Sequence, residues 1–325
     1  MSSQYSNCYK TLKFQSNYVY TTPIFGKVFL ELVEKINNFV PCLKLLAKGP
    51  NGYVPVLEAE NAIKKGILDC AFTPLSYSFV QNSLYELYTS IPFGMTAFAY
   101  ITYLFTEGLD KLNAEAEKDG LYFYPMCIVP PETGGWFNKE INTASDFNDI
   151  KMRIYGLSRN IITGVGATTV FVSVDDIIAA LKSGLINSAE YSTLEIDESI
   201  GLPNTCKYFY TPSWNQLSTV LYFVCNLKKW KSLTDKQRNM IQIFMKENMY
   251  TNYFSSNARQ VDYLIKYQSQ LKTFPNTVLN ALKTSWLNWL NLPKNINVKE
   301  EYEKMKAYEY KYNSYENIMK NNVYN

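Results

Sequence analysis

The chain contains no histidine in its 325 residues. This absence excludes Ser-His-Asp and Cys-His catalysis, and it excludes every metal site that depends on imidazole ligands. Any bound metal must therefore be held by carboxylate and carbonyl oxygens, which suit Na⁺, Ca²⁺ or Mg²⁺ rather than zinc.

Cysteine motifs are also missing. None of the six cysteines belongs to a CxxC pair, so zinc ribbons and thioredoxin-type motifs are absent. Cys70, Cys127 and Cys225 lie in apolar runs typical of strands, which predicts buried thiols. One or two disulfides remain open, because spacing alone does not assign a pairing.

Three further signals are weak or absent. Residues 1–18 contain no apolar h-region, so either a signal peptide has been removed or the chain is not exported. Residues 90–105 form the most apolar stretch, but Pro92 and Gly94 interrupt it, which predicts buried core rather than a membrane span. The net charge of +3 is close to balance, so we expect no nucleic-acid partner.

The chain does carry a repeated segment. Residues 62–71 read AIKKGILDCA and residues 180–189 read ALKSGLINSA, with no gap between them when aligned. Each copy predicts a helix, a glycine in a left-handed C-cap and a short strand. Before the second copy, Ser173 and Asp176 predict a helix N-terminus, and its strand stops at Glu190-Tyr191. The repeat favours two similar α/β lobes, although chance recurrence of a common unit stays open.

Strand-like and helical segments alternate up to about residue 228, and the remainder is helical. Expected strands cover residues 10–15, 42–47, 67–72, 122–129, 151–154, 168–174, 207–210 and 219–226. Expected helices cover residues 25–38, 58–65, 98–105, 109–118, 276–290 and 298–320, with a long one up to 266 that follows a capping box at 234–237. The alternation predicts an α/β fold with largely parallel sheets, and 325 residues suggest about two domains.

Four groups near predicted strand ends or turns are candidates for chemistry: Glu132, Arg153, Glu190-Tyr191 and residues 214–216. Ligands of open α/β sheets bind beyond the carboxyl ends of strands. An arginine there suits a ligand carboxylate, because its planar fork donates two parallel hydrogen bonds. A structural Arg–Glu bridge is an equal alternative. The two glutamates suit either a cation or an acid–base pair, but no sugar-hydrolase motif accompanies them.

The last predicted helix carries an apolar and aromatic stripe. Its members recur three and four residues apart: Tyr302, Met305, Tyr308, Tyr312, Tyr315 and Met319. Such spacing is typical of a heptad seam. The stripe predicts either packing of the helix on its own lobe or a contact between subunits.

Four stretches together resemble the extracytoplasmic solute-binding proteins of TRAP transporters, most closely the branch that binds 2-oxo acids. They read GGWFNKEI at 134–141, DIKMRI at 149–154, AALKSGLINSAEY at 179–191 and YFYTPSWNQLST at 208–219. The likeness extends from about Tyr9 to Lys320. It implies a two-lobe, periplasmic-binding-protein-like α/β fold with long C-terminal helices.

The same resemblance implies a domain organisation. Residues 1–130 would form mainly lobe I and residues 131–227 mainly lobe II. Residues 228–325 would form a helical region with a hinge-spanning helix and a C-terminal dimerisation helix.

The resemblance also implies a binding site. Arg153 matches the family's conserved arginine and would clamp the ligand carboxylate. Phe93 and Tyr77 would cap the ligand, and Trp214, Tyr191 and Glu132 would contact it. A bridging cation, Na⁺ or Ca²⁺, would be held by Glu132, Glu190, the main chain of Tyr191 and Gln216. The family pattern has an amide first, a tryptophan after the second ligand and an acid last, so here the carboxylates are kept but redistributed.

The implied function is transport rather than catalysis. The chain would bind a small 2-oxo or 2-hydroxy monocarboxylate between two closing lobes, deliver it to TRAP membrane subunits, and reside in the periplasm or another extracytoplasmic space. A homodimer through the C-terminal helix is expected. Three alternatives are a C4-dicarboxylate site that uses Lys139 or Arg159 as a second clamp, a hydrolase that uses Glu132 and Glu190, and a diverged scaffold kept for its dimer helix.

Overall fold

The computed structural model describes residues 9–78 and 83–321, and its chain forms two compact units. The first unit takes its described residues from Met1–Ser78, Glu107–Ile128 and Val220–Ser256. The second takes them from Phe79–Thr106, Val129–Thr219 and Asn257–Asn325. Each unit is therefore assembled from three separate stretches of sequence. No helix within the described ranges has an apolar stretch long enough to cross a membrane.

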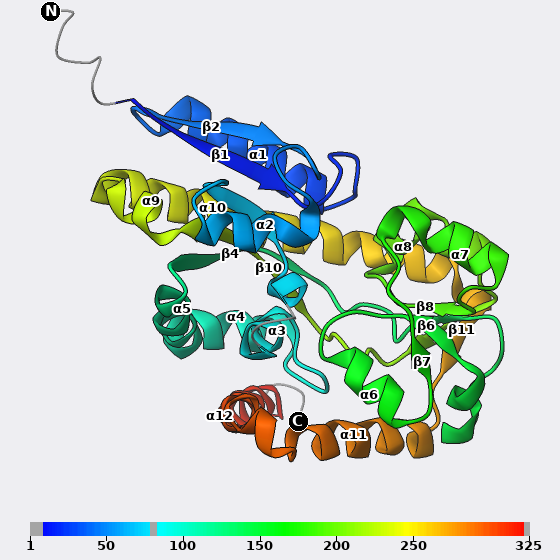
Figure 1. Ribbon diagram of the computed structural model, residues 1–325. Helices are drawn as coiled ribbons and strands as arrows, with labels where there is room; N and C mark the ends of the chain where they lie inside the picture. The colour runs from blue at the N-terminus through cyan, green and yellow to red at the C-terminus, as the bar shows by residue number, and fades with distance from the viewer. Residues whose placement is uncertain (1–8, 79–82, 322–325) are drawn as a thin grey trace, which may run out of the picture. The chain divides into compact units, whose positions relative to one another are not determined.

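The first unit contains a five-stranded sheet in the order β2-β1-β3-β10-β4 (Figure 1). Its strands are β1 (Lys10–Ser16), β2 (Leu43–Lys48), β3 (Cys70–Thr73), β4 (Leu121–Val129) and β10 (Thr219–Asn226). Its helices are α1 (Phe25–Phe39), α2 (Ala59–Lys64), α5 (Leu109–Lys118), α9 (Leu227–Ser232) and most of α10 (Asp235–Lys266). Strand β1 runs parallel to both β2 and β3, whereas β10 runs antiparallel to β3.

Aromatic side chains fill the core of the first unit. The ring of Phe14 on β1 lies 4.7 Å from Phe29 on α1 and 5.4 Å from Phe223 on β10, measured between centroids. Every residue of β3 is buried, as expected for a central strand covered on both faces.

The second unit contains a six-stranded sheet in the order β11-β9-β5-β8-β6-β7. Its strands are β5 (Trp136–Phe137), β6 (Lys151–Arg153), β7 (Thr168–Thr169), β8 (Ser188–Ala189), β9 (Tyr208–Thr211) and β11 (Leu271–Thr273). Its helices are α3 (Ser83–Thr89), α4 (Ala97–Tyr103), α6 (Ser158–Gly164), α7 (Ile177–Ser183), α8 (Leu194–Ile200), α11 (Asn276–Leu290) and α12 (Ile296–Asn321). The predicted α/β class is confirmed, and the sheets mix parallel with antiparallel pairs.

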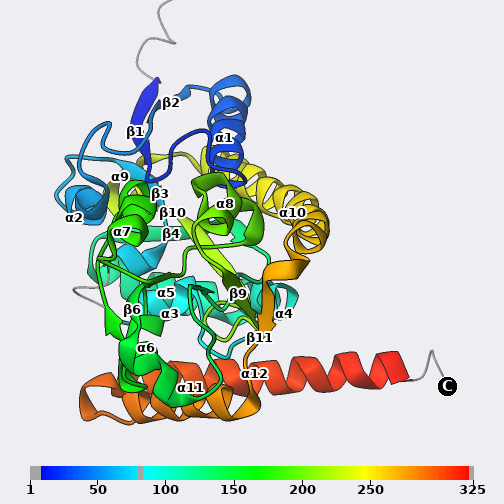
Figure 2. The same cartoon turned by 90° about the vertical axis from the view of Figure 1, so that its right-hand side faces the viewer.

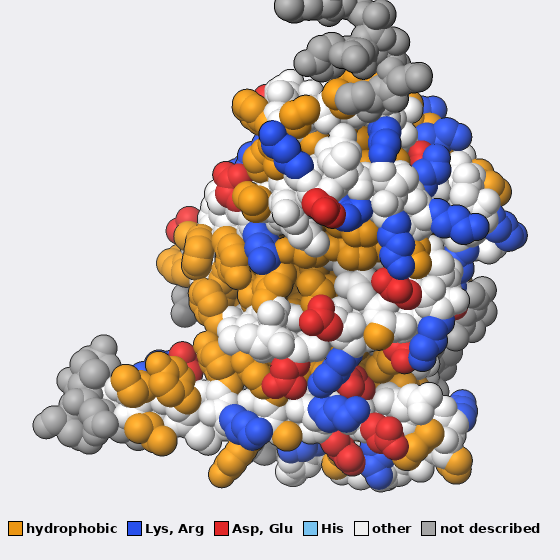
Figure 3. Space-filling model, turned by 90° about the vertical axis from the view of Figure 1, so that its left-hand side faces the viewer, with side chains coloured by type: hydrophobic (Ala, Val, Ile, Leu, Met, Phe, Trp, Pro, Cys, Tyr) orange, Lys and Arg blue, Asp and Glu red, His pale blue; other side chains and the backbone are white. Residues whose placement is uncertain are grey.

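The C-terminal helix α12 is anchored at its start and free at its end. Glu301 is buried and accepts hydrogen bonds from the hydroxyls of Tyr88 on α3 and Tyr103 on α4. Beyond this region α12 projects past the other helices of the second unit (Figure 2). Hydrophobic side chains gather on the projecting end (Figure 3), where Tyr310 is 77% and Ile318 62% exposed. The stripe predicted from the sequence therefore packs on its own unit near Met305 and is uncovered near its end.

The two repeat copies have the predicted local structure, one in each unit. Gly66 and Gly184 end α2 and α7 with φ of 71° and 75°, in the left-handed region that glycine adopts at low cost. A strand follows each glycine, β3 in one unit and β8 in the other.

Around the second copy, one local prediction was confirmed in part and one was wrong. Ser173 is the N-cap residue, but of a 3₁₀ turn at Val174–Asp176 that leads into α7, and its hydroxyl donates to the Asp176 carboxylate at 2.6 Å without capping the helix backbone. The strand expected at 168–174 covers only Thr168–Thr169, since its pairing with β6 ends there.

Candidate functional site

Two neighbouring strands of the second unit end in charged residues. Strands β6 and β8 pair in parallel, with Arg153 opposite Ala189. The amide of Glu190, the next residue, donates to the Arg153 carbonyl at 2.8 Å. Arg153 and Glu190 therefore lie at the same carboxyl edge of the sheet, where ligands of α/β proteins bind.

The Arg153 side chain is only 3% exposed, and its guanidinium is held by neutral groups. Its Nη1 donates to the Glu190 carbonyl oxygen at 2.5 Å and its Nε to the Val172 carbonyl at 3.4 Å. Its Cζ lies 4.2 Å from the ring centroid of Tyr155 and 5.1 Å from that of Tyr191. Across the described residues Arg153 makes no ion pair, so the guanidinium keeps donors for an anion.

Glu132 and Gln216 form a second pair. The Glu132 amide donates to the Gln216 carbonyl at 3.2 Å. With its NH₂ group turned inward, the Gln216 side chain donates to both Glu132 carboxylate oxygens, at 2.8 Å and 2.6 Å, and to Thr219 Oγ1 at 2.7 Å. Turned the other way, its carbonyl oxygen would face two carboxylate oxygens, an arrangement that needs either a proton on Glu132 or a cation between the oxygens.

The two carboxyl groups Glu132 and Glu190 interact directly. Burial raises the pKa of Glu132 well above its usual range, and the neighbouring Glu190 adds to the rise. Burial also raises the pKa of Glu190, against the opposing charge of Arg153. Without a cation, the two buried carboxyl groups therefore retain a proton more readily than the same two groups would in water.

The donor set at these residues fits a hard cation. Glu190 Oε1 is buried and accepts no hydrogen bond from the described residues, so one carboxylate oxygen is left for another partner. The described ranges contain no group of three or more acidic, histidine or cysteine side chains, so the set is two carboxylates with amide and main-chain oxygens. Such ligands suit Na⁺ or Ca²⁺.

Trp214 and Phe93 are brought together beside this group. The Trp214 indole donates to the Gly134 carbonyl at 3.2 Å. The Phe93 amide donates to the Trp214 carbonyl at 2.8 Å, and the two rings lie 6.2 Å apart. Phe93 has φ of 52°, a strained value for an aromatic residue, and its carbonyl accepts from Lys306 Nζ of α12 at 3.0 Å. Contacts from both sides hold the strained residue in place.

Asp197 is a site residue that sequence reasoning missed. It is fully buried and accepts from the Trp136 indole at 2.7 Å, the Ser192 amide at 3.0 Å and Thr133 Oγ1 at 3.4 Å. Thr133 and Ser192 directly follow Glu132 and Tyr191, so Asp197 fixes both ligand-bearing turns. Burial raises its pKa well above the usual range. An acid in the first turn of a helix is commonplace, so no local signal marks Asp197 for this role.

Asn215 was also missed. It is buried between Trp214 and Gln216 in sequence, and neither its Oδ1 nor its Nδ2 finds a partner in the described residues. A buried amide left unbonded is costly, so it is a candidate for a ligand or water contact.

Tyr77 is the predicted site residue that belongs to the first unit. It lies in the turn Leu75–Ser78, whereas the other seven predicted site residues belong to the second unit. Lys139 pairs with Asp149 at 3.4 Å and Arg159 pairs with Glu86 at 3.5 Å. Both candidate second clamps therefore already face an acid.

Known proteins resemble the chain in sequence. A family model described as bacterial extracellular solute-binding protein, family 7 (DctP), matches residues 51–289. A monocarboxylate 2-oxoacid-binding periplasmic protein of Nostoc sp. is 26% identical over 261 residues, covering 78% of this chain and 72% of that protein.

Solved structures resemble the chain in fold. A TRAP transporter solute-binding protein of Bordetella bronchiseptica, a dimer with calcium and picolinate, has a TM-score of 0.90 and 22% identity, with 98% of this chain and 96% of that one covered. One of Pseudoalteromonas atlantica, with sodium and pyruvate, has a TM-score of 0.87 and 23% identity, with 94% and 96% covered.

These likenesses confirm the two-lobe fold expected from the sequence. They also confirm the expectation of a binding protein rather than an enzyme, because the matched family is one of solute binders. Since the family model spans more than half of the sequence, the chain belongs to the bacterial extracellular solute-binding protein family 7.

Proposed function

We propose that this protein is the solute-binding component of a TRAP transporter and that it binds a small 2-oxo or 2-hydroxy monocarboxylate. The observation that carries the proposal is the buried Arg153 guanidinium, held by carbonyl oxygens and aromatic rings. A buried cation of this kind is stable only with an anionic partner. The names of relatives that bind pyruvate or 2-oxo acids support this ligand class.

Arg153 would bind the ligand carboxylate through two parallel hydrogen bonds. Phe93, Trp214, Tyr191 and Tyr77 would supply apolar and aromatic contacts to its short carbon skeleton. No covalent step is required.

A cation would complete the site. Glu132, Glu190, Gln216 and the main-chain carbonyl of Tyr191 would hold Na⁺ or Ca²⁺, in keeping with the relatives that have bound sodium with pyruvate or calcium with picolinate. When bound, the ion supplies positive charge to the ligand's oxygens. Glu132 and Glu190, which otherwise retain a proton between them, would have to release it, and the unbonded Glu190 Oε1 would be available to the ion.

The wider assignment is also proposed. The two units would be the two lobes, with residues 1–130 mainly in lobe I and residues 131–227 mainly in lobe II. Residues 228–325 would supply a hinge-spanning helix and a dimerisation helix. The exposed apolar end of α12 and the dimer named for the Bordetella relative support a homodimer. The family supports a periplasmic location and delivery to TRAP membrane subunits.

A thermal-shift experiment tests the ligand class. Protein stripped with EDTA is compared with protein in NaCl or CaCl₂, each with pyruvate, lactate, succinate or no acid. We expect pyruvate or lactate to raise the melting temperature most, and more with the cation than without it. At about a hundred times Kd the gain in stability is about 2.7 kcal/mol.

Three results would count against the proposal. No shift with any acid would favour a scaffold, and a larger shift with succinate would favour a dicarboxylate site. Turnover of an ester or glycoside that requires Glu132 would favour a hydrolase.

A further inference from the structure

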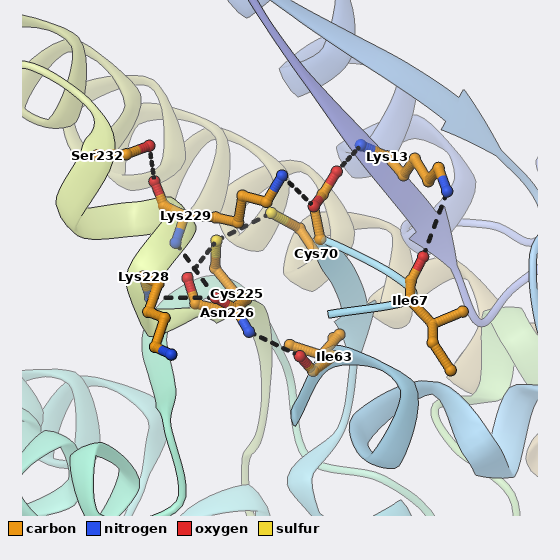
Figure 4. Close-up of polar contacts among 10 residues, drawn as sticks. Lys13, Ile63, Ile67, Cys70, Cys225, Asn226, Lys228, Lys229 and Ser232 are labelled. Atoms are coloured by element: carbon orange, nitrogen blue, oxygen red, sulfur yellow. Dashed lines mark hydrogen bonds and ion pairs between the residues drawn. The ribbon is translucent and has the colours of Figure 1, made fainter. Parts of the chain in front are cut away.

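Two buried cysteines of the first unit face each other across a strand pair. Cys70 on β3 lies opposite Cys225 on the antiparallel strand β10. Both are buried, and their Sγ atoms are 3.0 Å apart. Figure 4 shows the two sulfur atoms pointing toward one another.

The position of the pair in the ladder suits a covalent bond. The Asn226 amide donates to the Asp69 carbonyl at 2.9 Å, so the adjacent residues Asn226 and Asp69 form a hydrogen-bonded pair. Hydrogen-bonded and non-hydrogen-bonded pairs alternate along antiparallel strands, so Cys70 and Cys225 occupy a non-hydrogen-bonded pair. Side chains approach most closely there, within the Cα and Cβ separations that disulfides use.

Contacts on both sides hold the two strands in this register (Figure 4). The Asn226 side chain donates to the Ile63 carbonyl at 2.8 Å. Asp69, next to Cys70, accepts from the Lys13 amide at 2.8 Å and pairs with Lys229 at 3.2 Å. The sulfur atoms are therefore kept together by the fold and not by a single flexible loop.

We propose that Cys70 and Cys225 form a disulfide in the mature protein. Each thiol gives up a proton, one S–S bond forms, and two electrons pass to a disulfide oxidant such as oxidised glutathione or a thiol–disulfide oxidoreductase. The oxidant's own S–S bond is thereby reduced to two thiols. Cys42 is already disulfide-bonded, and the family is extracellular, where disulfides persist.

The bond forms while the sheet assembles. Burial raises the pKa of the Cys70 thiol in the folded protein, and the thiolate is the reactive species. Oxidation is therefore faster before β3 and β10 are covered than afterwards. In the structure Cys70, Cys127, Cys206 and Cys225 are all free thiols. Cys127 and Cys206 are buried as well but have no sulfur contact in the described ranges, so they serve as internal controls.

The crosslink joins residues 155 positions apart. In the sequence, the stretch of the first unit that contains β3 ends at Ser78, and the stretch that contains most of β10 begins at Val220. The bond fixes the register of these two strands within the first unit.

Peptide mapping tests the proposal on the full chain. The protein is expressed in a bacterial periplasm, unfolded without reductant in the presence of iodoacetamide, digested and analysed by mass spectrometry. We expect a linked Cys70–Cys225 peptide, with Cys127 and Cys206 alkylated. Alkylation of Cys70 and Cys225 in most molecules, or their pairing with other cysteines, would overturn the proposal.

Melting in the presence and absence of reductant gives a second measurement. Reduction should lower the melting temperature of the wild type by about 5 °C more than that of the Cys70→Ala/Cys225→Ala variant, which retains only the Cys42 disulfide. Cys127→Ala should respond as the wild type does. An equal fall in wild type and double variant contradicts the crosslink, and if the double variant does not fold, the peptide map of the wild type still decides.

Discussion

The two repeat copies have the same backbone and different strand ends. In each, a left-handed glycine ends a short helix and a strand parallel to its neighbour follows. The amide of Leu68 donates to Ala62 at 3.3 Å in the first unit, and that of Ile186 donates to Ala180 at 3.3 Å in the second. The repeated sequence therefore encodes one scaffold used twice.

The residues beyond the strands differ in charge. In the first unit the edge carries Asn17 and Thr73, whose side chains hydrogen-bond to each other at 2.8 Å. In the second it carries Arg153 and Glu190, whose charges are buried and incompletely paired. The polar groups Asn17 and Thr73 of the first edge satisfy each other, whereas at the second edge Glu190 Oε1 accepts no hydrogen bond from the described residues, so the shared scaffold does not by itself determine the chemistry of the edge.

Removing the charge at the second edge should have the largest effect. Arg153→Met should weaken pyruvate binding at least about a hundredfold, because truncating a buried charged partner costs about 2–5 kcal/mol. Arg153→Lys should weaken it about tenfold or more, since lysine lacks the planar fork. Isothermal titration measures both.

Arg259→Met is the matched control. Arg259 also lies in the second unit, but it pairs with Glu195 at 2.8 Å. Its replacement should leave the affinity within about twofold, as expected for a partly exposed pair. Unchanged affinity in Arg153→Met would refute the clamp.

Neutralising a buried acid should have opposite effects on stability in the two units. Burial raises the pKa of Glu86, on α3, to about 7 despite Arg159, and neither of its carboxylate oxygens accepts a hydrogen bond from the described residues. The folded protein therefore binds a proton that the unfolded chain has released, and stability is lost as pH rises from about 4.5 to about 7.

Glu86→Gln should remove this loss. Relative to wild type, the variant should gain up to about 2–3 kcal/mol between pH 4.5 and pH 8, measured by urea unfolding. Asp69→Asn in the first unit should instead destabilise at pH 8, since Asp69 accepts the Lys13 amide and pairs with Lys229. The prediction would be contradicted if the difference in unfolding free energy between Glu86→Gln and wild type stayed constant from pH 4.5 to pH 8.

A residue distant in sequence also contacts the candidate site of the second unit. Lys306 of α12 holds the carbonyl of the strained Phe93. Lys306→Met should weaken ligand binding roughly fivefold, about 1 kcal/mol after allowance for its partial exposure.

Two further variants isolate this role of Lys306. Lys304, two residues before Lys306 on the same helix, is exposed and pairs with Glu301 at 3.6 Å. Lys304→Met should have little effect on ligand affinity. In a Phe93→Gly background, where positive φ costs little, Lys306→Met should have no additional effect on affinity. Equal losses in both backgrounds would show that Lys306 acts without Phe93.

The smallest expected effect is shared by both copies. Gly66→Ala and Gly184→Ala place a side chain on a left-handed residue with nothing within 4 Å of its Cβ, so each should cost about 1 kcal/mol through the backbone alone. Denaturant unfolding should give similar values, and ligand affinity should not change. A selective loss of affinity in Gly184→Ala would mean that the second scaffold is itself tuned for binding.

Long elements with strong local signals could be predicted from the sequence. Strand β10 has the expected bounds because it is a continuous apolar run, and α11 because it lies between two prolines. The strands β5, β7 and β8 have two residues each, too few for periodicity to reveal their ends.

The sequence predicts the positions of the charged candidate residues, but not those of residues that support them through distant contacts. Arg153 and Glu190 follow strand-like runs, so their placement at an edge could be inferred. Asp197 and Lys306 act through contacts with residues distant in sequence, and no local pattern distinguishes them from ordinary helix-surface charges.

Each unit is built from three stretches of sequence, and this has a consequence for synthesis. The sheet of the first unit cannot close until β10 has been made, well after most of the second unit's strands. A polypeptide with so many distant pairings folds slowly and late. For the same reason, no single cut in the gene can yield either half as a protein that folds alone.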